Sequence, residues 1–299
     1  MPRKFNVVGV GEVLWDLLAS GPQLGGAPAN FAYHAHALGA NAHAIIRVGN
    51  DERGREILRR FRAMGLPTDT VQDDEQAPTG TATVSLGGQG GPNFVIQENV
   101  AWDFLAAAPA AESAASAADA ICFGTLAQRN PVSRAAIQRL LAAAPANALR
   151  VFDINLRQHY YSRELVEASL RLSNTLKLNH GELQVLAEMF ALTGPPEKQL
   201  ENLSENFSQQ IVALTQGGKG SLLYRDGRCS RCVPQPIKVV DTVGAGDAFT
   251  AALVMGLLHQ LDLDEINAFA NHVARYVCSQ PGATPPLPAF LATRFGVRD

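Results

Sequence analysis

The chain has 299 residues, 46% of them hydrophobic, which is enough for the core of one large α/β domain or two medium ones. Its net charge is −3 without any block of basic residues, and no apolar run reaches the roughly 18 residues of a membrane span. These properties argue against nucleic-acid and membrane partners. The first six residues lack the apolar core of a signal peptide, so we expect a cytoplasmic protein.

The first 65 residues alternate between strand and helix patterns. We expect strands at 5–11 and 44–48, a helix that opens within 25–30 and runs to about 38, and a second helix at 53–64. Pro28 suits the first turn of the earlier helix. This βαβα order is typical of a parallel sheet covered by helices.

The pattern changes at residues 78–100. Two strands, 81–86 and 93–97, are joined by the glycine-rich segment 87–92 with no helix between them, so we expect them outside the parallel sheet. Residues near 13–18 can pair with them. We interpret the two segments, about 13–24 and 78–104, as a small β-sheet lid.

After the lid, the α/β alternation resumes. We expect strands near 120–124, 149–154, 175–178 and 211–215, and helices at 131–143, 163–173, 181–188 and about 197–208. The alanine-rich stretch 106–118 is interpreted as surface helix and loop. An antiparallel edge ribbon at 221–224 and 228–233 precedes two apolar helices at about 245–260 and 264–278. We find no linker that would divide the chain, and so expect one domain over 1–299.

The turn at residues 241–250, Asp-Thr-Val-Gly-Ala-Gly-Asp-Ala-Phe-Thr, is the strongest chemical signal. Small residues at the start of a helix expose backbone N–H groups and form an anion site. Asp247 would repel a bound phosphate, but it makes sense as a base that deprotonates a hydroxyl attacking a phosphoryl group. The simpler interpretation is an aspartate in the favoured first turn of a helix.

Other polar residues follow predicted strands, where an open parallel sheet binds its ligands. Individually, a glycine pair is more often a turn, and Asn-x-x-Glu is more often a helix cap. Their common placement favours a single site, formed by Asp16, Gly25, Gly26, Asn30, Asp153, Asn155, Arg157, Asn179, Glu182, Thr215, Gly217 and Gly220.

These motifs together resemble the ribokinase-like, or PfkB, family of carbohydrate kinases. The segments 25–30 and 241–249 resemble its two signatures, and Asn179-x-x-Glu182 and Thr215-x-Gly217-x-x-Gly220 match its intermediate motifs. The resemblance covers about residues 5–290 and is strongest to fructokinases. It implies a three-layer α/β/α sandwich with a mostly parallel central sheet and a small β-sheet lid.

The resemblance also implies roles for the matching residues. Asp247 would take the proton from the sugar hydroxyl, and backbone N–H groups would hold the phosphoryl charge, namely those of Gly244, Ala245 and Gly246. An ordinary aspartate is ionised at neutral pH, so this role requires no large change in its pKa. Arg157 would hold a phosphate or sugar oxygen, or would form an ion pair with Asp153.

Three ligand sets follow from the resemblance. The sugar would contact Asp16, Gly25, Gly26, Asn30, Asn155, Asp247 and Phe94, which alternatively packs within the lid. ATP would contact Asn179, Thr215, Gly217, Gly220, Gly246 and Asn271. Mg²⁺ would be organised, largely through water, by Asn179 and Glu182. A monovalent cation such as K⁺ would lie near Asp241, Val243 and Gly282, although Pro286 stands where some relatives carry a hydroxyl residue.

The sequence therefore predicts an ATP- and Mg²⁺-dependent kinase of a sugar hydroxyl, with fructose as the preferred substrate. Alternatives are a 2-keto-3-deoxygluconate kinase or ribokinase, a nucleoside kinase, or a sugar- or nucleotide-binding protein without catalysis. The short lid and the segment 153–157 argue against the nucleoside kinase, and Asp247 argues against the silent binder. An exposed lid sheet also favours a homodimer.

Overall fold

A computed structural model describes residues 4–19, 21–86 and 92–295. Its main feature is a large sheet in which the described strands pair in parallel except at one edge. There, β12 pairs antiparallel with both of its neighbours, β11 and β13. In spatial order the strands are β13 (Arg228–Cys232), β12 (Ser221–Arg225), β11 (Ile211–Thr215), β10 (Thr175–Asn179), β9 (Leu149–Asp153), β8 (Ala120–Phe123), β1 (Asn6–Val10), β4 (Asn41–Gly49) and β5 (Val71–Asp74).

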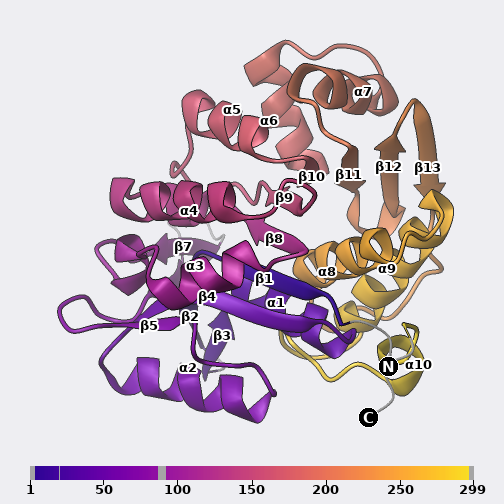
Figure 1. The fold of residues 1–299 in the computed structure, drawn as a ribbon. Coiled ribbons are helices and arrows are strands. Elements are labelled where there is room, and N and C mark those ends of the chain that lie inside the picture. Colours follow the sequence, from indigo (N-terminus) through magenta and orange to yellow (C-terminus); the bar gives the residue numbers. More distant parts are fainter. Residues whose placement is uncertain (1–3, 20, 87–91, 296–299) are drawn as a thin grey trace.

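Helices cover both faces of this sheet (Figure 1). One face packs against α1 (Ala27–Ala37), α2 (Glu52–Ala63), α8 (Ala245–Leu258) and α9 (Leu263–Cys278). The other packs against α3 (Pro109–Ser116), α4 (Pro131–Ala143), α5 (Arg163–Leu172), α6 (His180–Phe190) and α7 (Pro196–Phe207). A short helix, α10 (Ala289–Ala292), follows near the C-terminus.

Two separate hydrophobic clusters occupy the two sides of the sheet. Side chains alternate along a strand, so Val151 of β9 belongs to the cluster under α1, α8 and α9, whereas its neighbour Phe152 belongs to the opposite cluster. Val7 and Val8 of β1 divide in the same way. The structure thus confirms the predicted three layers.

A second, smaller sheet forms from the segments that were interpreted as a lid. Its order is β3 (Gly21–Gly25), β2 (Leu14–Leu18), β6 (Thr81–Leu86) and β7 (Pro92–Ile96). β2 pairs antiparallel with β3 and parallel with β6, and β6 pairs antiparallel with β7. Since β2 begins a few residues after β1 ends, the small sheet joins the large one at the carboxyl end of β1.

Two edge strands, β3 and β5, were missed by the sequence analysis. β3 reads Gly-Pro-Gln-Leu-Gly, a turn-like composition, but Pro22 is tolerated because an edge strand needs fewer N–H donors. β5 reads Val-Gln-Asp-Asp and lacks an apolar alternation. Within the described ranges, no helix combines the length and apolar character needed to cross a bilayer.

Candidate active site

The anion turn begins α8, as predicted. Gly244 is the N-cap residue, with φ 76°, and a Cβ there would lie 2.3 Å from the Ala283 carbonyl oxygen, so only glycine fits. The Ala245 N–H donates a long, 3.3 Å hydrogen bond to the Thr242 carbonyl. Gly246 and Asp247 follow in the first turn, where N–H groups have no intrahelical acceptor. The N–H groups that face a ligand here are therefore mainly those at the second and third helical positions.

Asp247 is held in place by Asn30. The Asn30 amide Nδ2 donates to Asp247 Oδ2 at 2.8 Å, so α1 orients the carboxylate of α8. Burial raises the pKa of Asp247 to about 6, with a further contribution from the Asp153 charge, while Asn30, Lys177 and Arg157 oppose the rise. The sequence analysis required no large change of this pKa, but the structure raises it. A base with a pKa near 6 is still mostly ionised at pH 7.

Lys177, which the sequence analysis missed, supplies a buried positive charge beneath the turn. Its Nζ donates to Asp153 Oδ1 at 3.0 Å, and Thr250 Oγ1 donates to Asp153 Oδ2 at 2.8 Å. A Cβ built on Gly246 would lie 3.1 Å from Nζ, so the ammonium lies close to the anion turn. Asp153 thus pairs with Lys177 rather than with Arg157. A lysine in the middle of the apolar strand Thr-Leu-Lys-Leu-Asn was the available signal.

The residues predicted for the sugar gather at the carboxyl end of β1. A Cβ on Gly25 would lie 2.5 Å from Asp16 Oδ2, and one on Gly26, whose φ is 117°, would lie 2.6 Å from the Glu12 carbonyl oxygen. Both glycines are therefore required by close packing. Burial raises the pKa of Asp16, and the Arg157 charge opposes this rise. Asp16 and Arg157 are thus within electrostatic reach of each other.

The other two sugar candidates, Asn155 and Phe94, lie in different segments. Asn155 follows β9 in a left-handed conformation with φ 42°, which turns the chain toward Arg157. The Arg157 guanidinium is exposed and donates to the Leu156 carbonyl at 3.0 Å. Phe94 lies opposite Val84 in the small sheet, but its side chain is outside the described part of the structure.

Glu12 is a second buried carboxyl group that the sequence analysis missed. It is 2% exposed, and its Oε2 has no hydrogen-bond partner among the described residues. Burial raises its pKa to about 7; hydrogen bonds from its own N–H and that of Ala27 and the Arg157 charge lower it, and Asp247 adds to the rise. Two carboxyl groups therefore titrate near neutrality in the same site.

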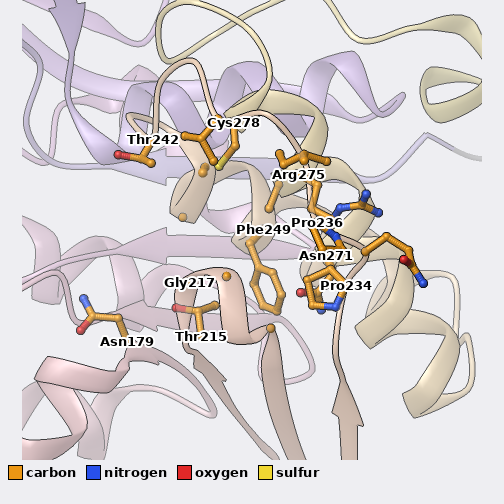
Figure 2. Close-up of a pocket in the computed structure, with 18 residues that line it drawn as sticks. Asn179, Thr215, Gly217, Pro234, Pro236, Thr242, Phe249, Asn271, Arg275 and Cys278 are labelled. Carbon is orange, nitrogen blue, oxygen red and sulfur yellow. The ribbon is translucent and has the colours of Figure 1, made fainter.

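A cavity of about 510 Å³ lies on the other side of the turn (Figure 2). Phe249 of α8 and Ala274 of α9 contribute apolar wall, and Pro234 and Pro236 come from the segment after β13. The cavity brings together every residue predicted for ATP, namely Asn179, Thr215, Gly217, Gly220, Gly246 and Asn271.

Asn179 and Glu182 form a helix cap at the start of α6. Asn179 Oδ1 accepts from the Glu182 N–H at 3.0 Å, and Glu182 Oε2 accepts from the Asn179 N–H at 2.7 Å. Glu182 Oε1 accepts from the Leu156 N–H at 3.1 Å. The capping interpretation is confirmed, and each carboxylate oxygen keeps a lone pair for a further ligand.

This donor set fits a magnesium ion bound mostly by water and phosphate. The described residues contain no group of three or more His, Cys, Asp or Glu side chains that could hold a metal. Glu182 and Asn179 nevertheless offer the oxygen atoms that Mg²⁺ prefers, and the ion needs few protein ligands when phosphates are present.

The residues predicted around a monovalent cation are joined by Asp241. Its Oδ1 accepts from the Val243 N–H at 3.0 Å and its Oδ2 from the Gly282 N–H at 3.1 Å. The His34 ring Nε2, on α1, contacts the Ala283 carbonyl oxygen at 2.9 Å. These contacts hold the loop after α9 against the anion turn.

Known proteins show the same combination of sequence and fold. Residues 21–289 match the family described as pfkB family carbohydrate kinase. The chain is 30% identical to fructokinase-1 of Oryza sativa subsp. japonica, across 96% of this chain and 95% of that protein. A sugar kinase from Pyrococcus horikoshii in complex with ATP is 26% identical, with a TM-score of 0.79 over 93% of this chain and 94% of the other. A fructokinase from Vibrio cholerae O395 with fructose, ADP and calcium ion is 25% identical, with a TM-score of 0.80 over 95% of this chain and 96% of the other.

Proposed function

The chain belongs to the PfkB family of carbohydrate kinases and is a sugar kinase that uses ATP, and from this premise we propose that it phosphorylates fructose with Asp247 as the general base. The observation that carries the proposal is the position of Asp247. Asn30 orients its carboxylate at the first turn of α8, and the cavity that fits a nucleotide is lined by the adjacent Gly246.

In the proposed reaction, Asp247 accepts the proton of the sugar hydroxyl as that oxygen attacks the γ-phosphorus of ATP. The bond between the γ-phosphorus and the bridging oxygen breaks, and ADP leaves. The N–H groups of the turn, chiefly those of Gly246 and Asp247, stabilise the charge of the transferring group, and the Lys177 ammonium beneath Gly246 adds to the positive potential. When bound, Mg²⁺ would neutralise phosphate charge, with Glu182 and Asn179 organising its water ligands.

On the sugar side, Asp16 and Arg157 are the groups we assign to substrate hydroxyls. Asp16 can accept hydrogen bonds from hydroxyl groups, and the Arg157 guanidinium can donate them. Fructose is proposed because the relatives reported above include a rice fructokinase and a fructokinase bound to fructose. Closure of the small sheet over the sugar would exclude water and prevent ATP hydrolysis.

The test is a panel of fructose, ribose, 2-keto-3-deoxygluconate and adenosine, each with ATP and Mg²⁺, with ADP release as the readout. We expect fructose to give the highest kcat/KM. A higher kcat/KM for another sugar would make that sugar the proposed substrate and would leave the proposed mechanism of phosphoryl transfer unchanged. Binding of sugar and nucleotide without ADP release would favour the silent binder.

The proposal extends to assembly, ions and location. β7 is an edge strand of the small sheet, and Val95 on it is 50% exposed, so pairing with a second copy to form a homodimer is the proposed assembly. A K⁺ ion near Asp241 and a cytoplasmic location complete the proposal. Light scattering and the dependence of turnover on K⁺ test the first two.

A further inference from the structure

Tyr160 closes the turn that carries Arg157. In the segment that follows β9, the Tyr160 N–H donates to the Arg157 carbonyl oxygen at 3.0 Å. Gln158, between them, has φ 49°, in the left-handed region that tight turns use. Among the described residues, the Arg157 guanidinium forms a hydrogen bond only with the adjacent Leu156 carbonyl. The position of Arg157 therefore depends on what fixes the two ends of its turn.

The start of the turn is fixed within the main domain. The Leu156 N–H donates to Glu182 Oε1 of α6 at 3.1 Å. The buried Thr125 hydroxyl, shortly after β8, donates to the Ile154 carbonyl oxygen at 2.9 Å. Both contacts are made to elements of the large sheet and its helices, so the start of the turn does not depend on the small sheet.

The end of the turn is fixed to the small sheet by the Tyr160 hydroxyl. This oxygen lies 2.8 Å from Glu98 Oε1 and 3.3 Å from the Ile96 carbonyl oxygen. A hydroxyl has one proton and donates to one acceptor at a time, and the shorter contact to a carboxylate is the stronger. Ile96 is the last residue of β7, and Glu98 follows where the chain leaves the small sheet. The two ends of one turn are thus attached to different sheets.

Arg129 holds the same junction together from the main domain. Its guanidinium donates to both carboxylate oxygens of Asp103, at 2.7 and 2.8 Å, and to the Gln97 carbonyl oxygen. The guanidinium carbon also lies 4.7 Å from the centre of the Tyr160 ring and 4.0 Å from that of the Trp102 ring. The Arg129 and Asp103 side chains are 6% and 2% exposed, and a two-pronged pair of this kind fixes its geometry. Arg129 therefore keeps the ring of Tyr160 next to the chain that leaves β7.

We propose that Tyr160 is a positioning residue for the sugar, which acts by holding the turn of Arg157 against the small sheet. The hydroxyl attaches the end of the turn to the residues that leave β7, and the guanidinium three residues earlier is thereby held for sugar hydroxyls. The inference rests on the proposed role of Arg157 in sugar binding. It gives the small sheet a second task besides the exclusion of water, namely to set the position of a cationic side chain that binds the substrate.

The simpler interpretation is that Tyr160 serves only the stability of the fold. Its ring packs against the hydrophobic cluster on the side of the sheet that α3 to α7 cover, and it lies under Arg129. Tyr160→Phe separates the two interpretations, because phenylalanine keeps the ring and its packing and removes only the hydroxyl. Only the positioning role makes this variant change the KM of the sugar without an equal change for ATP.

The experiment measures kcat and the KM values of fructose and ATP by coupled ADP release. Tyr161→Phe is the matched control, because the neighbouring Tyr161 packs against the same cluster and its hydroxyl has no hydrogen-bond partner in the described part of the chain. We expect Tyr160→Phe to raise the fructose KM about fivefold, with kcat and the ATP KM within about twofold of the parent. Tyr161→Phe should match the parent.

A double variant tests whether Tyr160 acts through Arg157. Arg157→Gln alone should raise the fructose KM about tenfold. If the two residues act together, Tyr160→Phe combined with Arg157→Gln should also give about tenfold, whereas independent effects would multiply to about fiftyfold. Multiplied effects would overturn the inference. It would also be overturned if Tyr160→Phe had the fructose KM of the control, or if it raised the ATP KM as much as the fructose KM.

Failure of the proposed function gives different results. An unchanged fructose KM in Arg157→Gln would refute the assignment of Arg157 to the sugar, and the inference with it. If the sugar panel selects another substrate, that sugar replaces fructose in the same assay and the comparison between variants is unchanged. Thermal unfolding of each variant verifies that it is folded.

Discussion

Replacement of Asp247 by asparagine should slow turnover and stabilise the fold at the same time. The asparagine side chain keeps an oxygen that can accept the hydrogen bond from Asn30, so the local geometry is retained, but it cannot take the proton of the sugar hydroxyl. Loss of a general base lowers turnover by about 10² to 10⁴. Nucleotide binding should persist, because the cavity is lined by Gly246 and not by the Asp247 carboxylate.

The gain in stability comes from the pKa of Asp247. Folding raises this pKa from 3.8 to about 6, so the carboxylate destabilises the native state once the pH exceeds 3.8, and the full penalty is present above pH 6. The difference corresponds to at most about 3 kcal/mol at pH 8 and about half of that at pH 5. Part of the Asp247 residue is exposed to solvent, which screens its charge. We therefore expect Asp247→Asn to raise the free energy of unfolding by about 1–2 kcal/mol at pH 8.

Urea unfolding at pH 5 and pH 8 measures this gain, and coupled ADP release measures turnover. Asp226→Asn is the control, because Asp226 is 85% exposed in its contact with Arg225. Turnover within a few-fold of the parent would refute Asp247 as the base. A stability difference that does not grow between pH 5 and pH 8 would refute the raised pKa.

Three further predictions concern the charges around the same base. Lys177→Met should destabilise the protein by about 3–5 kcal/mol, because it leaves the Asp153 charge buried without its ion-pair partner. Adding Asp153→Asn should recover part of the lost free energy of unfolding, measured with urea. No recovery would argue against the Lys177–Asp153 ion pair. Glu182→Gln should raise the Mg²⁺ concentration for half-maximal turnover several-fold, whereas an unchanged Mg²⁺ curve with only a lower Tm would leave Glu182 as a helix cap. Arg157→Gln should raise the sugar KM about tenfold and move the acidic limb of the kcat/KM profile to higher pH, since the Arg157 charge lowers the pKa of Asp247; an unmoved limb would contradict this coupling.

The architecture could be predicted from sequence where the signal was periodic. The buried parallel strands and the long helices were expected within a few residues of their observed ends, because apolar runs and terminal glycines mark them. The edge strands β3 and β5 could not be predicted in this way. Pro22 is tolerated because β3 pairs on one side only. Asp74 of β5 is buried, but its carboxylate pairs with Arg47 and accepts backbone N–H bonds, so a residue typical of turns fits a strand.

The candidate site was predictable where a residue type and a spacing carry the chemistry. The glycine turn before α8 and the residues of the nucleotide cavity are examples. Contacts between distant segments were not predictable. Asn30 and Asp247 are 217 residues apart in sequence, and Lys177 and Asp153 are 24 apart on neighbouring strands, so only the fold brings these pairs together.

The buried charges give a physical reason for the proposed Mg²⁺ dependence. Asp153, Glu182 and Asp247 lie around the anion turn, and Lys177 and Arg157 are the cations that act on their charges. Lys177 is already engaged with Asp153, so little positive charge remains for a polyphosphate next to an ionised base. A divalent ion at Glu182 would offset this repulsion while Asp247 stays ionised. Burial raises the pKa of Asp247 toward neutrality, and the Asp153 charge adds to this rise. A carboxylate that contributes to the proposed need for Mg²⁺ therefore also shifts the pKa of the proposed base.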